Sequence, residues 1–295
     1  MAVLNGSLSC FEQMDDVQFS HWTSLLEQRT GMHLPRERRS FLETSLGLRM
    51  KEIGIPDFTA YYHHLQSEKN GQQEWLTLVD RLTIHETRFF RHQPSLDFLE
   101  EIILPELFKS EPDRKKLQIW SAGCSTGEEV YTLGMLCQQF LKQHNNRAVS
   151  KPCYLAITGM DISVPALVTA RKALYDQYKV RHVPEQYLEE YFVAQHNGRY
   201  QIVEALKKRV CFVPFNIIDM KKTLLEPMDI IFCQNVLIYF NRDRRKQIIQ
   251  HLVKRLKPGG FLVLGAGESL NNPHPELEQI SYPNALAFRR SELVS

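Results

Sequence analysis

Polar side chains follow three separate strand-like apolar runs of this chain, and their chemical types suit a ligand that carries both positive charge and hydroxyl groups. Glu129 comes after a turn of small residues, Asp161 closes the next apolar run, and Gln234 and Asn235 follow a third. A carboxylate can pair with an ammonium group or accept hydrogen bonds from ribose hydroxyls, and an amide can contact an adenine ring or a ribose. Each residue taken alone has an ordinary alternative. Asp161, for example, equally suits a cap on a helix that begins near Val164.

The turn before Glu129 lies in the segment LQIWSAGCSTGEEVY, residues 117–131, which is typical of a buried strand, a tight turn and a helix opened by acids. Its small residues, Gly123 among them, would let a ligand approach the backbone closely, although glycines alone equally indicate a plain strand–helix turn with a Ser or Thr cap. The spacing matches neither the GxGxxG fingerprint nor the GxxxxGKS/T phosphate loop. Because Glu128 and Glu129 would repel a pyrophosphate, the segment favours a cationic ligand such as the ammonium group of an amino acid.

A sheet is needed to bring these side chains together, and the chain predicts one after residue 116. Helical stretches at 127–144, 164–173 and 242–256 lie between most of the strand-like runs, which are 117–121, 154–160, 210–214, 230–233 and 261–264. This pattern predicts an α/β fold with a parallel sheet and helices on both faces, whose ligands bind beyond the carboxyl ends of the strands. The motif KPGG predicts a turn into the last of these strands, and the run ALAFRR predicts a late antiparallel strand.

Residues 15–92 have a different texture, helical and poor in strands, and predict a small all-α domain. We expect a first helix that stops at Gly31, a second at 35–53 that stops at Gly54, and two more at 58–67 and 74–82. A linking segment at 93–116 carries a helix at about 95–104 that leads to Pro105. Residues 117–290 then form the α/β domain, with a β insertion at about 176–208.

Composition excludes several function classes. Hydrophobic residues make up 43% and charged residues 24% of the chain, and the formal net charge is only +2, so no overall attraction to nucleic acid or membrane follows. No run approaches the ~18 apolar residues of a membrane span, and no secretion signal is visible. The six cysteines are scattered without a CxxC pair, which predicts free thiols in a reducing compartment and no structural zinc or other metal. We therefore expect a cytoplasmic protein without membrane insertion.

Five motifs in a fixed order resemble one family, the chemotaxis receptor methyltransferases of the CheR type. They are LTIHETRFFR (82–91), WSAGCSTGEEVY (120–131), the strand that ends at Asp161, FCQNVLIYF (232–240) and LKPGGFLVLGAGES (256–269). The resemblance implies a class I methyltransferase fold, a Rossmann-like doubly wound sheet with a small all-α N-terminal domain and a β-hairpin insertion. It also implies transfer of a methyl group from S-adenosylmethionine to glutamate side chains on the cytoplasmic helical bundle of chemoreceptors, with S-adenosylhomocysteine as the product.

The resemblance implies roles for individual residues. It places Thr87 and Arg91 at the cofactor, Glu129 on the methionine ammonium, Asp161 on the ribose, Asn216 and Ile217 around the adenine, Gln234 and Asn235 along the remaining wall, and Tyr239 beside the transferred methyl group. Gly123 and His85 complete the candidate cofactor contacts, and Arg91 and Tyr239 are the catalytic candidates. Three positions depart from the family's usual residues: His85 replaces Asn, Gln234 replaces Arg, and Val130 replaces Pro.

Two further segments bear on how a substrate is recognised. A predicted helix carries five basic residues that could steer an acidic receptor helix, although nearby glutamates dilute the patch; they are Arg36, Arg38, Arg39, Arg49 and Lys51. Between Asp161 and Asn216 lie 54 residues, which include the predicted hairpin FVAQHNGRYQIV at 192–203. Some family members use an inserted β-subdomain here to grip a pentapeptide tether at the receptor C-terminus. Because those members have a longer, glycine-rich turn than HNG, we expect tether-independent recognition.

Two alternatives to a receptor methyltransferase stay open on the sequence. A nucleic-acid methyltransferase would usually present an Asn-Pro-Pro-Tyr-like loop where this chain has CQNVLIYF, and no basic, aromatic-rich surface is evident. We therefore expect no nucleic-acid partner. A signalling scaffold that binds S-adenosylmethionine without transferring its methyl group is the second alternative, and the presence of both Arg91 and Tyr239 disfavours it.

Overall fold

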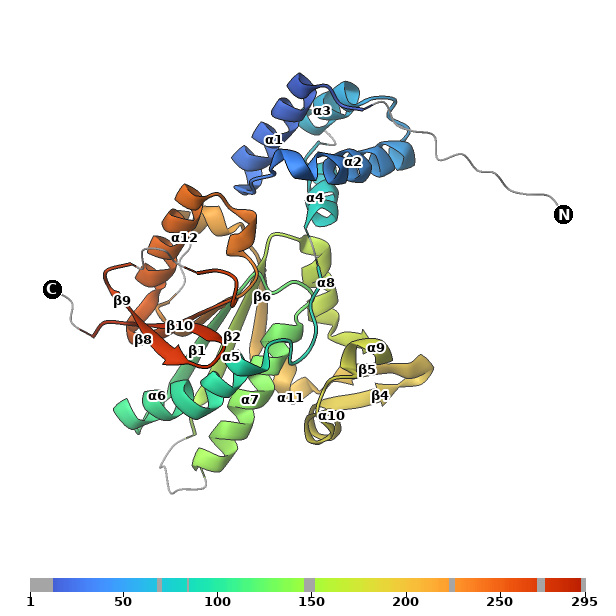
Figure 1. The fold of residues 1–295 in the computed structure, drawn as a ribbon. Coiled ribbons are helices and arrows are strands. Elements are labelled where there is room, and N and C mark those ends of the chain that lie inside the picture. The colour runs from blue at the N-terminus through green and yellow to red at the C-terminus, as the bar shows by residue number, and fades with distance from the viewer. Residues whose placement is uncertain are drawn as a thin grey trace. The chain divides into compact units, whose positions relative to one another are not determined.

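A computed structural model describes residues 13–67, 71–83, 85–145, 152–222, 226–269 and 274–292 of the chain (Figure 1). The chain forms two compact units, Met1–Ile84 and His85–Ser295. None of the described helices is long and apolar enough to cross a membrane. The described cysteines are all free thiols, and Cys10 lies outside the described residues.

The first unit is a cluster of helices around one apolar core. Its helices are α1 (Asp16–Thr30), α2 (Arg39–Ile53), α3 (Phe58–Gln66) and α4 (Gly71–Leu82). The side chains of Trp22, Leu42 and Tyr61 are at most 1% exposed and hold the helices together by apolar burial. Gly31 and Gly54 end α1 and α2 in the left-handed region, with φ of 75° and 72°, as predicted from the glycine stops.

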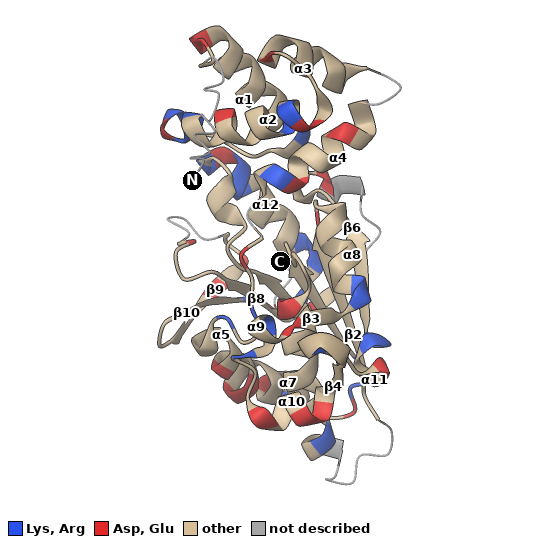
Figure 2. Cartoon of the chain, turned by 90° about the vertical axis from the view of Figure 1, so that its right-hand side faces the viewer, with Lys and Arg blue, Asp and Glu red and all other residues tan. Residues whose placement is uncertain are grey.

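The basic face predicted on the second helix is smaller than the sequence indicated. Arg49 pairs with Glu74 at 2.7 Å, and Arg39 pairs with Asp16 at 2.7 Å, so both guanidinium groups are engaged inside the unit. Arg36, Arg38 and Lys51 remain exposed and form a reduced basic face. Lys, Arg, Asp and Glu are interspersed along these helices (Figure 2). A steering role for this face therefore depends on three residues rather than five.

The second unit contains a seven-stranded sheet in the order β6-β2-β1-β7-β8-β10-β9. Its strands are β1 (Lys116–Ala122), β2 (Tyr154–Asp161), β6 (Val210–Pro214), β7 (Met228–Cys233), β8 (Leu256–Leu264), β9 (Leu277–Tyr282) and β10 (Ala285–Arg290). The first five strands in the order pair in parallel, and β10 runs antiparallel to both β8 and β9. The chain moves outward from β1 to one side and then from β7 to the other, so the strand order reverses between β1 and β7.

Side chains of the central strands enter two separate cores, one on each face of the sheet. Along β1, Ile119 belongs to one apolar cluster and Trp120 to the other, as expected when successive side chains of a strand point to opposite faces. Helices α7 (Glu128–Asn145) and α8 (Val164–Lys172) contribute to the first cluster, and α12 (Arg242–Arg255) contributes to the second. The prediction of a parallel α/β sheet with helices on both faces is confirmed.

Two details differ from the predicted elements. The segment 257–260, predicted as a turn, lies within β8 as an irregularity: Leu256 pairs with Met228 and Phe261 with Ile230. The predicted linking helix does not stop before Pro105, because α5 (Gln93–Phe98), a π-helical turn (Leu99–Ile103) and α6 (Leu104–Ser110) follow one another directly. Pro105 cannot donate a backbone hydrogen bond to the preceding turn, and the π-helical turn directly before it is where the regular α-helical pattern is interrupted.

A second, smaller sheet lies between α8 and β6 in the chain. It consists of β3 (Leu174–Asp176), β5 (Arg199–Ile202) and β4 (Phe192–Gln195), all antiparallel, with short helices α9 (Gln177–Val180), α10 (Glu185–Tyr191) and α11 (Glu204–Lys207) beside them. Strands β4 and β5 form the hairpin expected around HNG, in which Asn197 and Gly198 both have positive φ, 66° and 69°. Two consecutive left-handed residues suit a tight hairpin turn.

Candidate functional site

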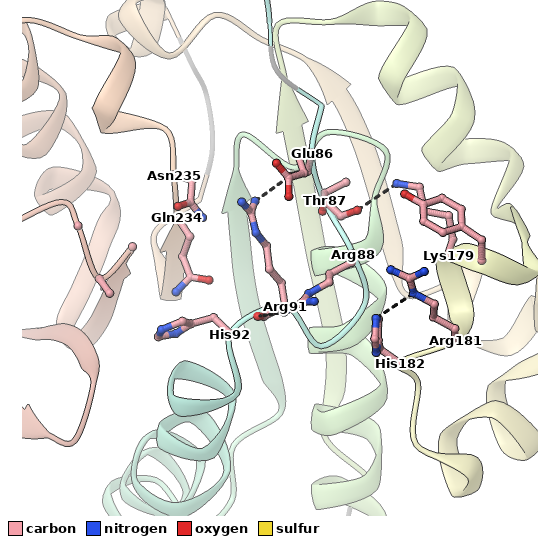
Figure 3. Close-up of a pocket in the computed structure, with 14 residues that line it drawn as sticks. Glu86, Thr87, Arg88, Arg91, His92, Lys179, Arg181, His182, Gln234 and Asn235 are labelled. Carbon is pink, nitrogen blue, oxygen red and sulfur yellow. Dashed lines mark hydrogen bonds between the residues drawn. The ribbon is translucent and has the colours of Figure 1, made fainter.

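A pocket of about 400 Å³ lies in the second unit and is lined by three parts of the chain: residues 86–92, residues 178–182, and the loops that follow β7 and β8 (Figure 3). Four predicted site residues line it, namely Thr87, Arg91, Gln234 and Asn235. Gln234 and Asn235 directly follow β7, so the pocket opens at the carboxyl edge of the sheet. This is the edge where the strand order reverses, and open α/β sheets bind their ligands there.

Glu129 is a half-buried carboxylate in the first turn of α7, and its surroundings leave it short of positive charge. Ser121 Oγ donates a hydrogen bond to it at 2.8 Å, and no described basic side chain lies within ion-pair distance. Burial raises the pKa of Glu129 to about 7, against the opposing effects of the Ser121 hydrogen bond and the Arg91 charge. A carboxylate held in this state is stabilised by a cation, so the site fits the ammonium group of a bound ligand.

Glu128, the neighbour of Glu129, has a different role from the one predicted. Its side chain is fully buried, and Lys179 Nζ lies 2.8 Å from its carboxylate. The sequence predicted that both acids would be available to a cationic ligand. This prediction is wrong for Glu128, because Lys179 already neutralises it. Lys179 also donates to the carbonyl oxygen of Thr87 at 3.0 Å, so this ion pair fastens the residues around Thr87 to α7.

Asp161 ends β2 and fastens the strand–helix turn to it. One carboxylate oxygen accepts from the N–H of Ser125 at 2.7 Å and the other from the N–H of Ser163 at 2.9 Å. Burial raises the pKa of Asp161, and these backbone hydrogen bonds oppose the rise. The helix α8 is capped by the side chain of Ser163, so the alternative in which Asp161 is the cap is wrong. The bond to Ser125 supports that residue's left-handed conformation, with φ of 49°.

Gly123 lies between Asp161 and the loop that follows β7. Its φ is 81°, and a Cβ atom at this position would lie 2.3 Å from Val236 Cγ2. Glycine is therefore required at this position by close packing against the loop. The reason predicted from the sequence was the close approach of a ligand. Gly123 itself is exposed, so its backbone is also open to a ligand.

Two adjacent phenylalanines hold the segment that carries Thr87 and Arg91. Phe89 is fully buried and packs edge-on against Tyr175 with ring centres 4.9 Å apart. Phe90 has a φ of 52°, and its N–H donates to Thr132 Oγ1 on α7 at 3.2 Å. Arg91 faces the pocket with its guanidinium donating to the carbonyl oxygen of Glu86 at 2.7 Å (Figure 3). The buried ring of Phe89 and the partly buried ring of Phe90 fix the segment, and the flanking polar residues face the pocket.

The remaining predicted residues lie outside the lining of this pocket. His85 Nδ1 is 3.4 Å from Ser125 Oγ, so it contacts the strand–helix turn. Asn216 and Ile217 follow β6 at the same edge of the sheet, and Asn216 Oδ1 accepts from the N–H of Ile218 at 3.3 Å. Tyr239 ends the short helix Leu237–Tyr239 and packs against the apolar cluster that α12 covers.

Glu268 is a central residue that the sequence reasoning left without a role. Its side chain is 2% exposed, and its carboxylate accepts four backbone hydrogen bonds, from Gly265, Asn235, Leu237 and Ile238, at 2.6–3.3 Å. These bonds hold the loop that runs from Asn235 to Tyr239. Asn235 itself is in the left-handed region, with φ of 59°. The signal was an acid after the last parallel strand, in the motif GAGES.

Replacing Glu268 with alanine is expected to destabilise the second unit by about 2–4 kcal/mol, because four backbone donors lose their buried acceptor. Thermal unfolding would be measured on Glu268→Ala and on Glu278→Ala, which removes an exposed carboxylate on β9. Equal melting temperatures for the two variants would show that the carboxylate does not hold the loop.

Comparisons with known proteins agree with this architecture. A family model described as CheR methyltransferase, SAM binding domain, matches residues 85–285, and one described as CheR methyltransferase, all-alpha domain, matches residues 18–83. Chemotaxis protein methyltransferase 1 of Pseudomonas aeruginosa is 30% identical over 275 residues, which cover 93% of this chain and 98% of that protein. The chemotaxis protein methyltransferase of Borreliella burgdorferi is 30% identical over 255 residues, covering 86% of this chain and 88% of that protein. That of Escherichia coli is 28% identical over 262 residues, covering 88% and 86%.

Proposed function

The chain belongs to the CheR methyltransferase family, and we propose that it methylates glutamate side chains on the cytoplasmic signalling helices of chemoreceptors. The products would be glutamate methyl esters and S-adenosylhomocysteine. The observation that carries the proposal is the unneutralised carboxylate of Glu129 at the same sheet edge as a pocket that Arg91 lines. Glu129 favours a cationic group, such as the ammonium of S-adenosylmethionine, and Arg91 favours an anionic group, such as the carboxylate of a substrate glutamate.

The described residues fit S-adenosylmethionine, which supplies an electrophilic methyl group when bound. Glu129 would hold the ammonium group, since it has no described cationic partner of its own. Asp161 would accept hydrogen bonds from the ribose, because its two oxygens have more lone pairs than the backbone N–H groups of Ser125, Ile162 and Ser163 use. Asn216 and Ile217 would surround the adenine, and Gln234 and Asn235 would form the remaining wall. His85, Thr87 and Gly123 would complete the contacts. The described residues hold no cluster of metal-ligating side chains, and the proposed reaction needs none.

The catalytic task of this chain is orientation and exclusion of water. A glutamate carboxylate is already ionised at pH 7, because its unperturbed pKa is near ~4.3, so no general base is required. Arg91 would hold the substrate carboxylate in line, and Tyr239 would shape the space for the transferred group. Water stabilises separated charges more than a transition state in which they diminish, so an enclosed pocket favours the reaction. Alignment can contribute ~7–11 kcal/mol in well-oriented cases.

The partner we propose is the helical bundle of a chemoreceptor, which the enzyme would bind in the cytoplasm. We propose no nucleic-acid partner and no insertion of this chain into the membrane. The reduced basic face of Arg36, Arg38 and Lys51 would attract an acidic receptor helix. The receptor could serve flagellar chemotaxis or pilus-type motility, and both use the same chemistry on the glutamate.

The proposed enzyme acts without a receptor tether. The turn of the β4–β5 hairpin has only the left-handed pair Asn197 and Gly198 at its tip, shorter than the glycine-rich turns of tether-binding relatives. A peptide of the last five residues of a candidate receptor is therefore expected to bind more weakly than ~1 mM in calorimetry. Micromolar binding that is lost on mutation of Asn197 or Gly198 would contradict this prediction.

Labelled methyl transfer tests the proposed function directly. The full chain would be incubated with methyl-labelled S-adenosylmethionine and purified cytoplasmic fragments of chemoreceptors, and base-labile methyl esters would be mapped to individual glutamates. Label on glutamates of the signalling helices would support the proposal. Cofactor binding without label on any fragment would favour a sensing scaffold. In a parallel incubation with RNA and DNA, label on the nucleic acid instead would favour a nucleic-acid methyltransferase.

A further inference from the structure

We propose that Arg88 and Arg181 form an anion-binding subsite beside Arg91, which recognises acidic side chains that flank the target glutamate on the substrate helix. The inference rests on the proposed function and narrows it, because it makes the charge of the neighbouring residues a determinant of which glutamates are methylated. Figure 3 shows Gln234 and Asn235 on one side of the pocket, Lys179, Arg181 and His182 on the other, and Arg88 and Arg91 between them.

The pocket carries more positive charge than the reaction uses. Arg88, Arg91, Lys179 and Arg181 all line it, against the single carboxylate of Glu86. Lys179 is neutralised by Glu128 at 2.8 Å. No described carboxylate lies within ion-pair distance of the three arginines. Three guanidinium groups around a space of about 400 Å³ repel one another, and an anionic ligand would relieve that repulsion.

The extra charge is not suited to the cofactor. S-adenosylmethionine carries a sulfonium, an ammonium and one carboxylate at pH 7, a net charge of about +1, so a cluster of arginines would disfavour it overall. The target glutamate brings a single negative charge, which Arg91 alone can match with a bidentate contact. Arg88 and Arg181 therefore remain for anionic groups that belong to the substrate but do not react.

The side chain of Arg181 is held in place by two neighbouring side chains. Its guanidinium carbon lies 5.1 Å from the ring centre of Tyr178, and its Nε donates to His182 Nε2 at 2.9 Å. The four remaining N–H donors of the guanidinium have no described partner and can face an incoming carboxylate. Within the described part of the chain, Arg88 makes one long side-chain hydrogen bond, 3.4 Å to the carbonyl oxygen of Arg91. Ordering Arg181 beforehand lowers the entropic cost of binding an anion.

A helical substrate presents the matching charges. On an α-helix, residues three or four positions from the target lie on the same face, with Cβ atoms about 5–6 Å away. A glutamate held by Arg91 therefore brings acidic neighbours one turn away within reach of the long side chains of Arg88 and Arg181. A glutamate with neutral or basic neighbours would lose this interaction, so the subsite selects among the glutamates of one helix.

Steady-state methyl transfer on the full chain tests the subsite. The double variant R88A/R181A would be compared with K109A/K115A, which removes two exposed lysines near the amino end of β1, the sheet edge opposite to the pocket. The substrate is a purified chemoreceptor cytoplasmic fragment, used both unchanged and with the acidic residues one turn from the methylated glutamate replaced by glutamine. Affinity for S-adenosylhomocysteine would be measured by calorimetry.

We expect R88A/R181A to raise KM for the unchanged fragment roughly tenfold, with the loss falling on KM rather than kcat and with S-adenosylhomocysteine affinity retained. On the neutralised fragment the wild-type chain should already show the high KM, and the double variant should add no further loss. An unchanged KM in R88A/R181A would overturn the subsite, as would a parallel loss of S-adenosylhomocysteine affinity. If the wild-type chain transfers no methyl group to any fragment, it is the proposed function that fails.

Discussion

Arg91→Ala is expected to lower kcat for receptor methylation by about 10²- to 10³-fold, the range for loss of one preorganised charged donor at a reacting group. Arg91 lines the pocket, and its guanidinium donates one hydrogen bond to the carbonyl oxygen of Glu86, at 2.7 Å. Its other donors have no described partner, so they can hold the substrate carboxylate. Without them the carboxylate would be free to rotate and to stay hydrated, and both effects slow its approach to the methyl group.

The measurement pairs turnover with cofactor affinity, because the resemblance also places Arg91 near the cofactor. We expect S-adenosylhomocysteine to bind Arg91→Ala within about tenfold of the wild-type affinity, since Glu129 and Asp161 remain. Arg91→Lys keeps the charge but not the planar fork, and it should recover only part of the activity. Methyl transfer by Arg91→Ala at the wild-type rate, with cofactor binding intact, would refute the catalytic role.

The fold could be predicted from the sequence because its signals are local and periodic. The runs that became β1, β2, β6 and β7 are short and apolar, and both faces of the central strands are buried, as Ile119 and Trp120 show. Glycine stops ended α1 and α2 where expected. The KPGG irregularity inside β8 was missed, because a local turn signal does not reveal whether strand pairing resumes around it.

Without the family resemblance, the candidate site was predictable only where a side chain stands at a recognisable strand end. Asp161 ends β2 and Asn235 follows β7. The sequence does not distinguish the roles of Glu128 and Glu129, which are adjacent acids. In the helix their side chains point about 100° apart. Glu128 therefore pairs with Lys179, whereas Glu129 accepts a hydrogen bond from Ser121. Lys179 lies 51 residues from Glu128, in an insertion without periodic pattern. Lys179 lies on the short helix α9 of this insertion, and a partner so distant in sequence leaves no signal near Glu128.

Glu129→Gln is expected to weaken the binding of S-adenosylmethionine and S-adenosylhomocysteine by about 100-fold. The substitution keeps the size of the side chain and an acceptor for Ser121 Oγ, but it removes the charge that would pair with the ligand ammonium. Loss of one partner from a largely enclosed charge pair costs about 2–5 kcal/mol, and each 1.4 kcal/mol corresponds to about tenfold in affinity. Calorimetry with S-adenosylhomocysteine at pH 8 measures the effect.

The pH dependence of binding separates the charge of Glu129 from its shape. The pKa of Glu129 is raised to about 7 in the ligand-free protein, so the group is protonated below that pH and must lose its proton to bind an ammonium. The dissociation constant of the wild-type chain should rise up to about tenfold per pH unit below pH ~7, with proton release on binding, and should level off near pH ~8. The Glu129→Gln variant should show neither this slope nor the proton release.

The substitution Glu129→Gln is expected to change the stability of the ligand-free protein in the opposite direction to its change in ligand affinity. A carboxyl group whose folded pKa lies above its ordinary value destabilises the fold progressively as pH rises from about 4.5 to about 7, because the unfolded chain releases the proton first. Glu129→Gln removes that penalty, so the ligand-free variant should melt at a higher temperature than the wild-type chain at pH 8 and at a similar temperature near pH 5. The expected gain at pH 8 is on the order of 1–3 kcal/mol. A variant that loses both affinity and stability would instead indicate a damaged fold, whereas weaker binding together with greater stability is the signature of a carboxylate kept for a cationic ligand.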